Sequence, residues 1–178
     1  MPVLIFNQRS IQEILDVIVS IGNLVGRRQD AQDLVAGYVS NIERIQTESA
    51  GHTSRRVYFE EWDDPMITGI QWVSELMEIA GGEDIFRDRS RGKLAKERFV
   101  TAQDVIMRAP EVVFASWCGK AFDRAAFEAR PGFDGLPAVQ SGDVHEIPAE
   151  IILQPGPACL TDGLEALRHV LAHSRNTG

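Results

Sequence analysis

Apolar positions in the first part of the chain follow helical spacing after a short apolar start. Residues 2–6 are apolar and predict a buried strand. In residues 11–25 the apolar positions recur every three or four residues, which predicts an amphipathic helix, and Ser10 and Glu13 have the spacing of a capping box at its start. A second helix is predicted at about 28–48, and at about 1.5 Å per residue it would span roughly 30 Å.

From residue 51 onward, apolar strand patterns alternate with helical patterns. The predicted strands are residues 57–62, 112–116 and 144–147. The predicted helices are residues 70–80, a short helix that Thr101 caps and Pro110 ends, a helix after Lys120, and a final helix that Thr161 and Asp162 cap. Gly81 and Gly82 end the first of these helices and lead into a short acidic turn. Because 112–116 is apolar on both faces, as buried parallel strands are, the predicted fold class is α/β with a parallel sheet.

The composition fits one compact domain, or one domain and a fragment of another. The 178 residues are 44% hydrophobic and carry a formal net charge of −8, with a pI near 5.0. Proteins that bind nucleic acid usually have a basic face, so this balance argues against a nucleic-acid partner. The basic residues between 87 and 98 are interrupted by Asp88 and Glu97, which is typical of a solvated loop.

The sequence as written shows neither a secretion signal nor a membrane span. The apolar start at residues 2–6 is short and polar residues follow it, so it does not predict a secretory signal, and no apolar run approaches the length of a membrane helix. On this basis the chain as written is expected to stay in the cytoplasm. Cys118 and Cys159 do not form a disulfide framework and are compatible with a reducing compartment.

Two aromatic residues follow predicted strands at the point where each strand ends. Trp62 closes the first strand and is followed by Asp63 and Asp64, and Trp117 follows the second strand. Ligands bind at the carboxyl ends of the strands in an open α/β sheet, so both indoles are predicted to flank one binding cleft. The alternatives are that Trp62 belongs to the core and that the two aspartates initiate the turn before Pro65.

The cysteines and histidines are further candidates for reactive or metal-binding sites. Cys118 lies near Lys120, and a thiol near a cation can react or bind a soft metal, although a small, partly buried residue is the simpler interpretation. A metal site formed by Cys118 and Cys159 is a further hypothesis. His169 and His173 are one helical turn apart, but without a third ligand nearby a solvated helix end is favoured. No nucleophile and base can be paired, so neither an enzymatic activity nor a cofactor is predicted.

An ordered set of segments covers nearly the whole chain. The segments are Gly22-Asn23-Leu24-Val25-Gly26-Arg27, Glu75-Leu76 with residues 79–86, residues 105–113, residues 137–144, Pro155-Gly156-Pro157 and Asp162-Gly163-Leu164. No segment is specific by itself, but the ordered set is. By this set the chain resembles the substrate-binding proteins of ABC importers for cobalamin, haem and iron-siderophores, and most closely their cobalamin-binding branch.

The resemblance implies a clamshell fold of two lobes joined by a long rigid helix, with the solute held in the crevice between them. Residues 1–50 would then be a remnant of the N-terminal lobe together with the connector helix, and residues 51–178 the C-terminal α/β lobe, a parallel sheet between two layers of helices. Residues 2–6 would be the last strand of the first lobe. The chain would correspond to the C-terminal two-thirds of such a protein.

The resemblance also implies a function, which is binding of cobalamin or a related metal chelate as a solute for an ABC-type importer of the periplasm. The implied ligand-binding residues of this lobe are Trp62, Asp63, Asp64, Trp117, Cys118, Lys120, Leu153 and Gln154. The implied permease-docking residues are Gln103 and Asp104, although family members dock through a glutamate. The alternative is therefore a cytoplasmic corrinoid-binding or sensor module that keeps the fold without docking to a permease. Without the cover of a first lobe, the truncated chain is also expected to self-associate.

Overall fold

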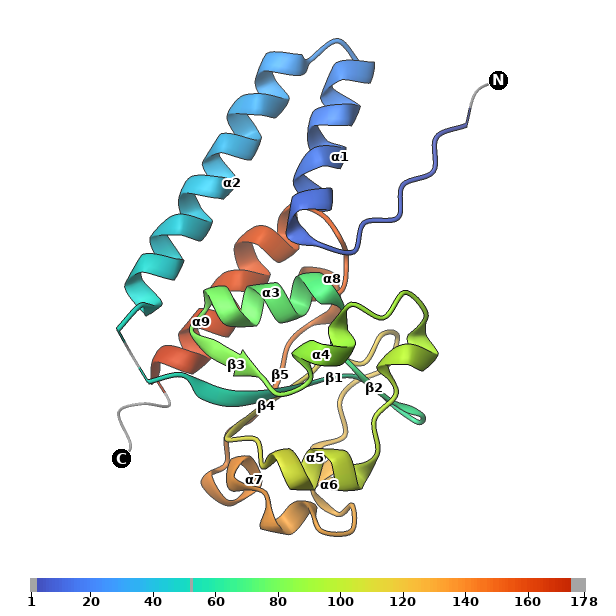
Figure 1. Cartoon of the computed structure of the whole chain (residues 1–178), viewed down its shortest axis with the longest axis vertical. Helices are drawn as coiled ribbons and strands as arrows, with labels where there is room; N and C mark the ends of the chain where they lie inside the picture. The colour runs from blue at the N-terminus through green and yellow to red at the C-terminus, as the bar shows by residue number, and fades with distance from the viewer. Residues whose placement is uncertain (1–2, 52, 174–178) are drawn as a thin grey trace.

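Across residues 3–51 and 53–173, which the computed structural model describes, a mixed five-stranded sheet lies between two layers of helices (Figure 1). The strands are β1 (Arg55–Asp63), β2 (Met66–Thr68), β3 (Gly82–Asp84), β4 (Val112–Ala115) and β5 (Val144–Glu146). The order is β2-β1-β4-β5, and β3 pairs with the start of β1. Only β2, in this part of the chain, is antiparallel to its neighbour.

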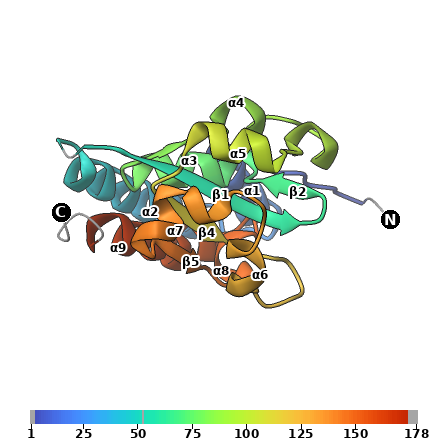
Figure 2. The ribbon, with the colours of Figure 1, turned by 90° about the horizontal axis from the view of Figure 1, so that it is seen from below.

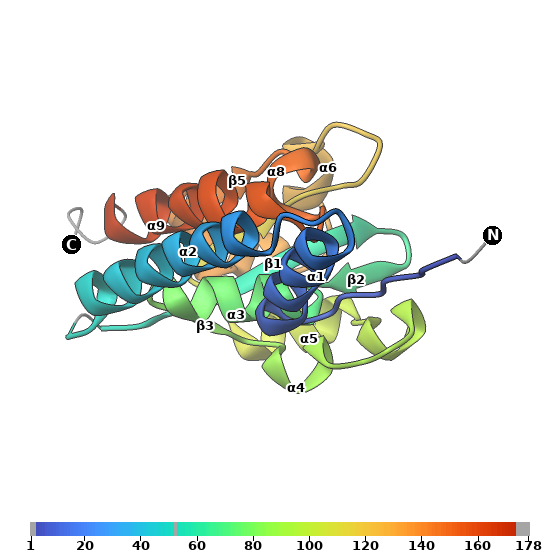
Figure 3. The same ribbon diagram turned by 90° about the horizontal axis from the view of Figure 1, so that it is seen from above.

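Helices cover both faces of this sheet, as Figures 2 and 3 show from opposite sides. One face carries α1 (Ile11–Leu24), α2 (Arg28–Ser49), α3 (Gln71–Ile79), α8 (Ala149–Ile152) and α9 (Leu164–His173). The other face carries α5 (Ala102–Arg108), α6 (Arg124–Glu128) and α7 (Pro137–Ser141). The four-residue helix α4 (Arg87–Ser90) follows β3. The layered α/β prediction is confirmed.

Alternating side chains of the central strands fill two separate cores. In β1, Val57 and Phe59 face the core shared with α3 and α9, whereas Tyr58 faces the core shared with α5 and α6. In β4, Phe114 faces the first of these cores and Val113 faces the second. All five side chains are fully buried. Period-two alternation with apolar residues on both sides is what a parallel strand covered by helices requires.

The predicted helices at 11–25 and 28–48 are confirmed, and α1 begins at the predicted capping box. The backbone N–H of Glu13 donates to the Ser10 hydroxyl at 3.2 Å, and the Ser10 N–H donates to the Glu13 carboxylate at 3.2 Å. These contacts satisfy amides that the first helical turn leaves without partners. The 22 residues of α2 extend about 33 Å at 1.5 Å per residue.

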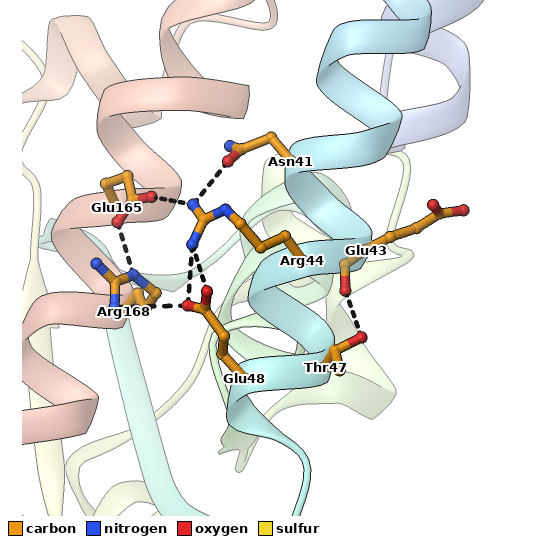
Figure 4. Close-up of polar contacts among 7 residues, drawn as sticks. All are labelled: Asn41, Glu43, Arg44, Thr47, Glu48, Glu165 and Arg168. Atoms are coloured by element: carbon orange, nitrogen blue, oxygen red, sulfur yellow. Dashed lines mark hydrogen bonds and ion pairs between the residues drawn. The ribbon is translucent and has the colours of Figure 1, made fainter.

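Ion pairs join the carboxyl half of α2 to α9 (Figure 4). Arg44 contacts Glu48 on its own helix at 2.8 Å and Glu165 on α9 at 2.7 Å, and Arg168 contacts Glu165 at 2.6 Å. All four side chains are partly exposed, so the pairs orient the two helices more than they stabilise the fold. Beneath them Ile45 is fully buried in the core that α9 shares.

The strand predicted at residues 2–6 is wrong for the described residues, which begin at residue 3. Residues 3–9 are extended but belong to no strand, and Val3 and Ile5 are 74% and 88% exposed. The apolar run has strand character, but a strand forms only where a neighbouring strand supplies hydrogen-bond partners. None of the described strands pairs with this segment.

The exposed N-terminal segment leads to a prediction of self-association. Val3, Leu4, Ile5 and Phe6 form a run of exposed apolar side chains, and such surface tends to find a partner. Light scattering at high concentration should give a mass above the 19.7 kDa of one chain, and replacing Val3 and Ile5 with serine should return the mass to that of a monomer. A wild-type protein that stays monomeric at high concentration would contradict this prediction.

Two local predictions need correction. The acidic turn expected after Gly82 is strand β3, because Glu83 and Asp84 pair with Arg56 and Val57 of β1. The expected cap at Thr161 is also wrong. The chain is already helical there, in a wide π-type turn over Cys159–Gly163 that continues into α9, and the Thr161 hydroxyl donates to the Pro157 carbonyl at 3.0 Å.

The basic segment between 87 and 98 is not simply a solvated loop. It contains α4 and a 3-10 turn over Ala95–Arg98, and Arg98 is 4% exposed. The Arg98 guanidinium donates to both carboxylate oxygens of Glu61, at 2.5 and 3.1 Å, and to the Thr68 carbonyl at 2.6 Å. A charge is buried at such low exposure only when it is paired, and this bidentate contact meets that need.

Candidate functional site

A hollow of about 500 Å³ opens where the parallel strands β4 and β5 end. The residues that line it are Trp117, Gly119, Lys120 and Ala121 after β4, and Glu146, Ile147, Pro148, Ala149 and Glu150 at the end of β5 and the start of α8. Trp62 and Asp63, at the end of β1, contact Lys120 in this wall. The carboxyl edge of a parallel sheet is where α/β proteins bind ligands, so this hollow is the candidate site.

The structure brings the two predicted tryptophans together around one cation. The Lys120 ammonium lies 4.7 Å from the centre of the Trp62 ring and 4.7 Å from the centre of the Trp117 ring. Both distances are within the range of cation–π attraction. The same ammonium lies 2.7 and 2.8 Å from the two carboxylate oxygens of Asp63. The structure thus places Trp62 and Trp117 side by side, as expected, with Asp63 and Lys120 between them, and contact of these residues with a ligand stays a prediction.

The two indoles differ in exposure. Trp117 is only 5% exposed, and its ring N–H donates to the Glu60 carboxylate at 3.1 Å. Trp62 is half-buried, and its ring N–H donates to the Asp64 carbonyl at 3.0 Å. Trp117 lines the hollow, but its ring is largely covered and supports the lysine, whereas Trp62 is more open and borders the hollow through its contact with Lys120. The expectation that both indoles line the cleft is therefore corrected, because the described lining of the hollow includes Trp117 and not Trp62.

The aspartates after Trp62 have separate roles in the structure. Asp63 still belongs to β1. Burial acts to raise the pKa of Asp63, but the hydrogen bond and the charge of Lys120 lower it by more, so the pKa lies below its ordinary value. Asp64 is exposed and begins the turn to β2 with Pro65, which is the turn role that the sequence offered as an alternative. Of these two carboxylates, Asp63 is the one that contacts the site.

A buried polar cluster beneath the hollow holds Trp117 in place. Glu60 is fully buried and accepts hydrogen bonds from Trp117, from the Tyr58 hydroxyl at 3.0 Å, and from Arg130 at 2.5 and 2.9 Å. Burial raises the pKa of Glu60, and the hydrogen bond and charge of Arg130 oppose that rise. Burial, together with the Glu60 charge, also raises the pKa of Tyr58 well above its ordinary value. The cluster was missed because no local pattern marks it.

Aromatic contacts continue from Trp117 into the second core. Successive ring pairs Trp117–Phe122, Phe122–Phe127 and Phe127–Phe133 lie edge to face, with centres 5.0, 5.6 and 5.0 Å apart. The Phe122 N–H donates to the Glu146 carboxylate at 3.0 Å. The loop after β4 is thus anchored to the core and to β5, so the wall it forms has a defined shape.

Several residues that were predicted to bind the ligand are not part of the described lining of the hollow. Cys118 is exposed, Leu153 is half-buried and packs against the core, and Gln154 is exposed; the described lining of the hollow includes none of the three. Their contact with a ligand stays a prediction. The lining residues 146–150 were missed, although they span the end of the predicted strand at 144–147 and the residues after it, where the same strand-end rule could have found them.

No metal centre is visible in the part of the chain that the structure describes. Cys159 is buried in the first core and its thiol contacts the Gly156 carbonyl at 3.1 Å, whereas Cys118 is exposed. No group of three or more potential metal-binding side chains occurs among the described residues. The side chain of His173 lies outside them, so the histidine-pair hypothesis is not examined by the structure.

The predicted docking residues lie in the first turn of α5. Gln103 is exposed. Asp104 is half-buried, and its carboxylate accepts from the N–H and the hydroxyl of Thr101, both at 2.9 Å. These contacts lower the pKa of Asp104, with the backbone hydrogen bond as the largest cause. Asp104 is therefore committed to capping its own helix, and permease docking by Gln103 and Asp104 stays a prediction.

Comparison with known proteins gives matches over most of the chain. A sequence model of the periplasmic binding protein family matches residues 1–151. The vitamin B12-binding protein of Vibrio cholerae is 24% identical over 156 residues, which cover 85% of this chain and 53% of that protein. The chain spans about half the length of the vitamin B12-binding relatives it matches.

Solved structures share the architecture. A possible iron-binding, periplasmic solute-binding protein of Staphylococcus epidermidis is 25% identical with a TM-score of 0.78, over 92% of this chain and 63% of that one. The periplasmic vitamin B12 binding protein BtuF of Vibrio cholerae is 21% identical with a TM-score of 0.72, over 96% of this chain and 64% of that one. The second likeness supports the fold alone.

Proposed function

Because this chain belongs to the periplasmic binding protein family, we propose that it is a solute-binding component of an ABC-type importer for cobalamin or a related metal chelate. The family and the solved neighbours are solute-binding proteins rather than enzymes. Import through an ABC permease, the identity of the solute and a periplasmic location are the proposed parts. Among the described residues, no helix combines the length and the apolar character needed to cross a membrane.

The observation that carries the proposal is the wall built around Lys120. The hollow lies at the carboxyl edge of the sheet, Trp117 lines it and is held by the buried Glu60, and Lys120 links the lining to the half-buried Trp62 beside it. A large, flat chelate can place apolar surface against Trp62 and polar substituents against Lys120 and the end of β5. The vitamin B12-binding relatives support cobalamin as the first solute to test.

Replacing Trp62 with alanine should weaken cobalamin binding by about tenfold, because the partly exposed aromatic face beside the hollow and one side of the Lys120 contact are lost. Trp62→Phe should recover much of that loss, because it keeps an aromatic face. Titration of tryptophan emission with cyanocobalamin, corrected for ligand absorption, measures both affinities. If Trp62→Ala bound cobalamin as tightly as the wild type, Trp62 would not line the binding site.

A further inference from the structure

We propose that Glu146 and Glu150 are the specificity-determining residues of the hollow, and that they favour chelates with a neutral, amide-bearing periphery over chelates that carry carboxylates there. This inference rests on the proposed function, because it concerns the solute of the same hollow. It goes further by naming the chemical class of solute that the charges of this chain can accept.

The lining of the hollow has an excess of negative charge. Of the described residues that line the hollow, three are charged at neutral pH: Lys120, Glu146 and Glu150. Asp63 contacts the Lys120 ammonium through both of its oxygens and neutralises it. With Lys120 and Asp63 counted as one neutral pair, the hollow keeps the two negative charges of the glutamates.

The neighbouring arginines Arg124 and Arg130 contact other acceptors. Arg124 contacts Glu128 at 2.6 Å and the Val144 carbonyl at 3.1 Å, and Arg130 contacts the buried Glu60. Among the ion pairs of the described residues, none involves either glutamate of the hollow. Both side chains are exposed, so they meet a solute as carboxylates. Their charge is therefore available to attract or repel it.

The Glu146 carboxylate is held in position by a backbone hydrogen bond. One oxygen of Glu146 accepts from the Phe122 backbone N–H at 3.0 Å, in a loop that the aromatic contacts of Trp117 and Phe122 anchor. The second oxygen remains an acceptor that can face the hollow. A primary amide of a solute can donate to that oxygen in a charge-assisted hydrogen bond, whereas a solute carboxylate has no donor and is repelled.

Corrinoids that have nearly the same shape but differ in one charge can show whether charge affects binding. Cyanocobalamin has no net charge, and hydrolysing one of its peripheral propionamides at a time gives isomeric monocarboxylic acids of nearly the same shape. Equilibrium dialysis of the full chain at low ionic strength should show at least one isomer binding about tenfold more weakly than cyanocobalamin, as expected for like charges within about 10 Å near a protein surface. Salt at about 0.5 M should reduce the difference to about twofold, because the Debye length then falls well below that distance.

The variant Glu146→Gln/Glu150→Gln should bind the acids and cyanocobalamin with affinities within about twofold of each other. Glu83→Gln is the matched control, because Glu83 is exposed and pairs with Arg56 at the opposite end of β1, and it should keep the tenfold preference. Equal binding of all isomers by the wild type at low salt would overturn the inference while leaving solute binding in place. Absence of binding by cyanocobalamin and every isomer would overturn the proposed function and the inference with it. If the double variant fails to fold, the salt series on the wild type still tests the charge preference itself, and a preference that does not change with salt would overturn the inference.

Discussion

Replacing Glu60 with alanine should lower the free energy of unfolding by about 3–5 kcal/mol, which is the usual cost of removing one partner from a buried ion pair. The carboxylate is fully buried and accepts from Arg130, Tyr58 and Trp117. Alanine would leave a partly buried guanidinium, a hydroxyl and an indole N–H without their acceptor. Denaturant unfolding monitored by circular dichroism measures the loss.

A double-mutant cycle distinguishes this explanation from a simple cavity. Arg130→Ala should also destabilise the protein, and the double variant Glu60→Ala/Arg130→Ala should lose less than the sum of the two, because no unpaired charge remains. Glu60→Gln keeps an acceptor for the Trp117 N–H and should cost about 1–2 kcal/mol. Strictly additive losses would show that the two side chains are not coupled and would contradict the ion-pair explanation of the loss.

Replacing Asp84 with asparagine should stabilise the protein by about 2–3 kcal/mol at pH 7.5. Burial raises the pKa of Asp84 from 3.8 to about 6, against the opposing hydrogen bonds of Ser74 and the Phe86 N–H, and each pKa unit corresponds to about 1.4 kcal/mol. The ionised carboxylate is therefore disfavoured in the folded protein. Asparagine keeps an oxygen that can accept from the Phe86 N–H at the position where Asp84 accepts at 2.9 Å.

The gain from Asp84→Asn should depend on pH in a defined direction. A carboxyl whose pKa is raised on folding contributes stability below its unfolded pKa, and that contribution is lost as the pH rises through the folded pKa of about 6. At pH 4 the gain should therefore fall below about 1 kcal/mol. Glu83→Gln, which removes the neighbouring exposed carboxylate of β3, is the matched control for the loss of one negative charge. An equal gain from Asp84→Asn at both pH values would contradict the assignment.

The sequence predicted the elements that carry strong local patterns. The capping box at Ser10 and the apolar alternation in β1 and β4 each reflect a local rule, and the structure has them. By contrast, β2 and β3 have three residues each, too few to show a period, and they form because β1 offers hydrogen-bond partners. The error at residues 2–6 has the same cause, since apolar residues favour a strand but only a partner strand completes it.

The site was predictable in outline and not in detail. The strand-end rule placed Trp62 and Trp117 at the same edge of the sheet, and Lys120 joins them there. The burial of Trp117 depends on Glu60, which lies 57 residues earlier in the chain, and no local pattern reports such a contact. The lining residues 146–150 were overlooked because the strand β5 and the helix α8, with three and four residues, are too short to show a periodic pattern of apolar positions.

The central claim is that this chain binds a solute at the carboxyl edge of its sheet and leaves it chemically unchanged. Equilibrium dialysis of the wild-type chain against cyanocobalamin, followed by the visible spectrum and mass of the recovered ligand, tests it directly. We predict saturable binding with the recovered ligand identical to the ligand added. Bound ligand that stays at the level of a denatured control, or ligand that is recovered altered, would contradict the claim.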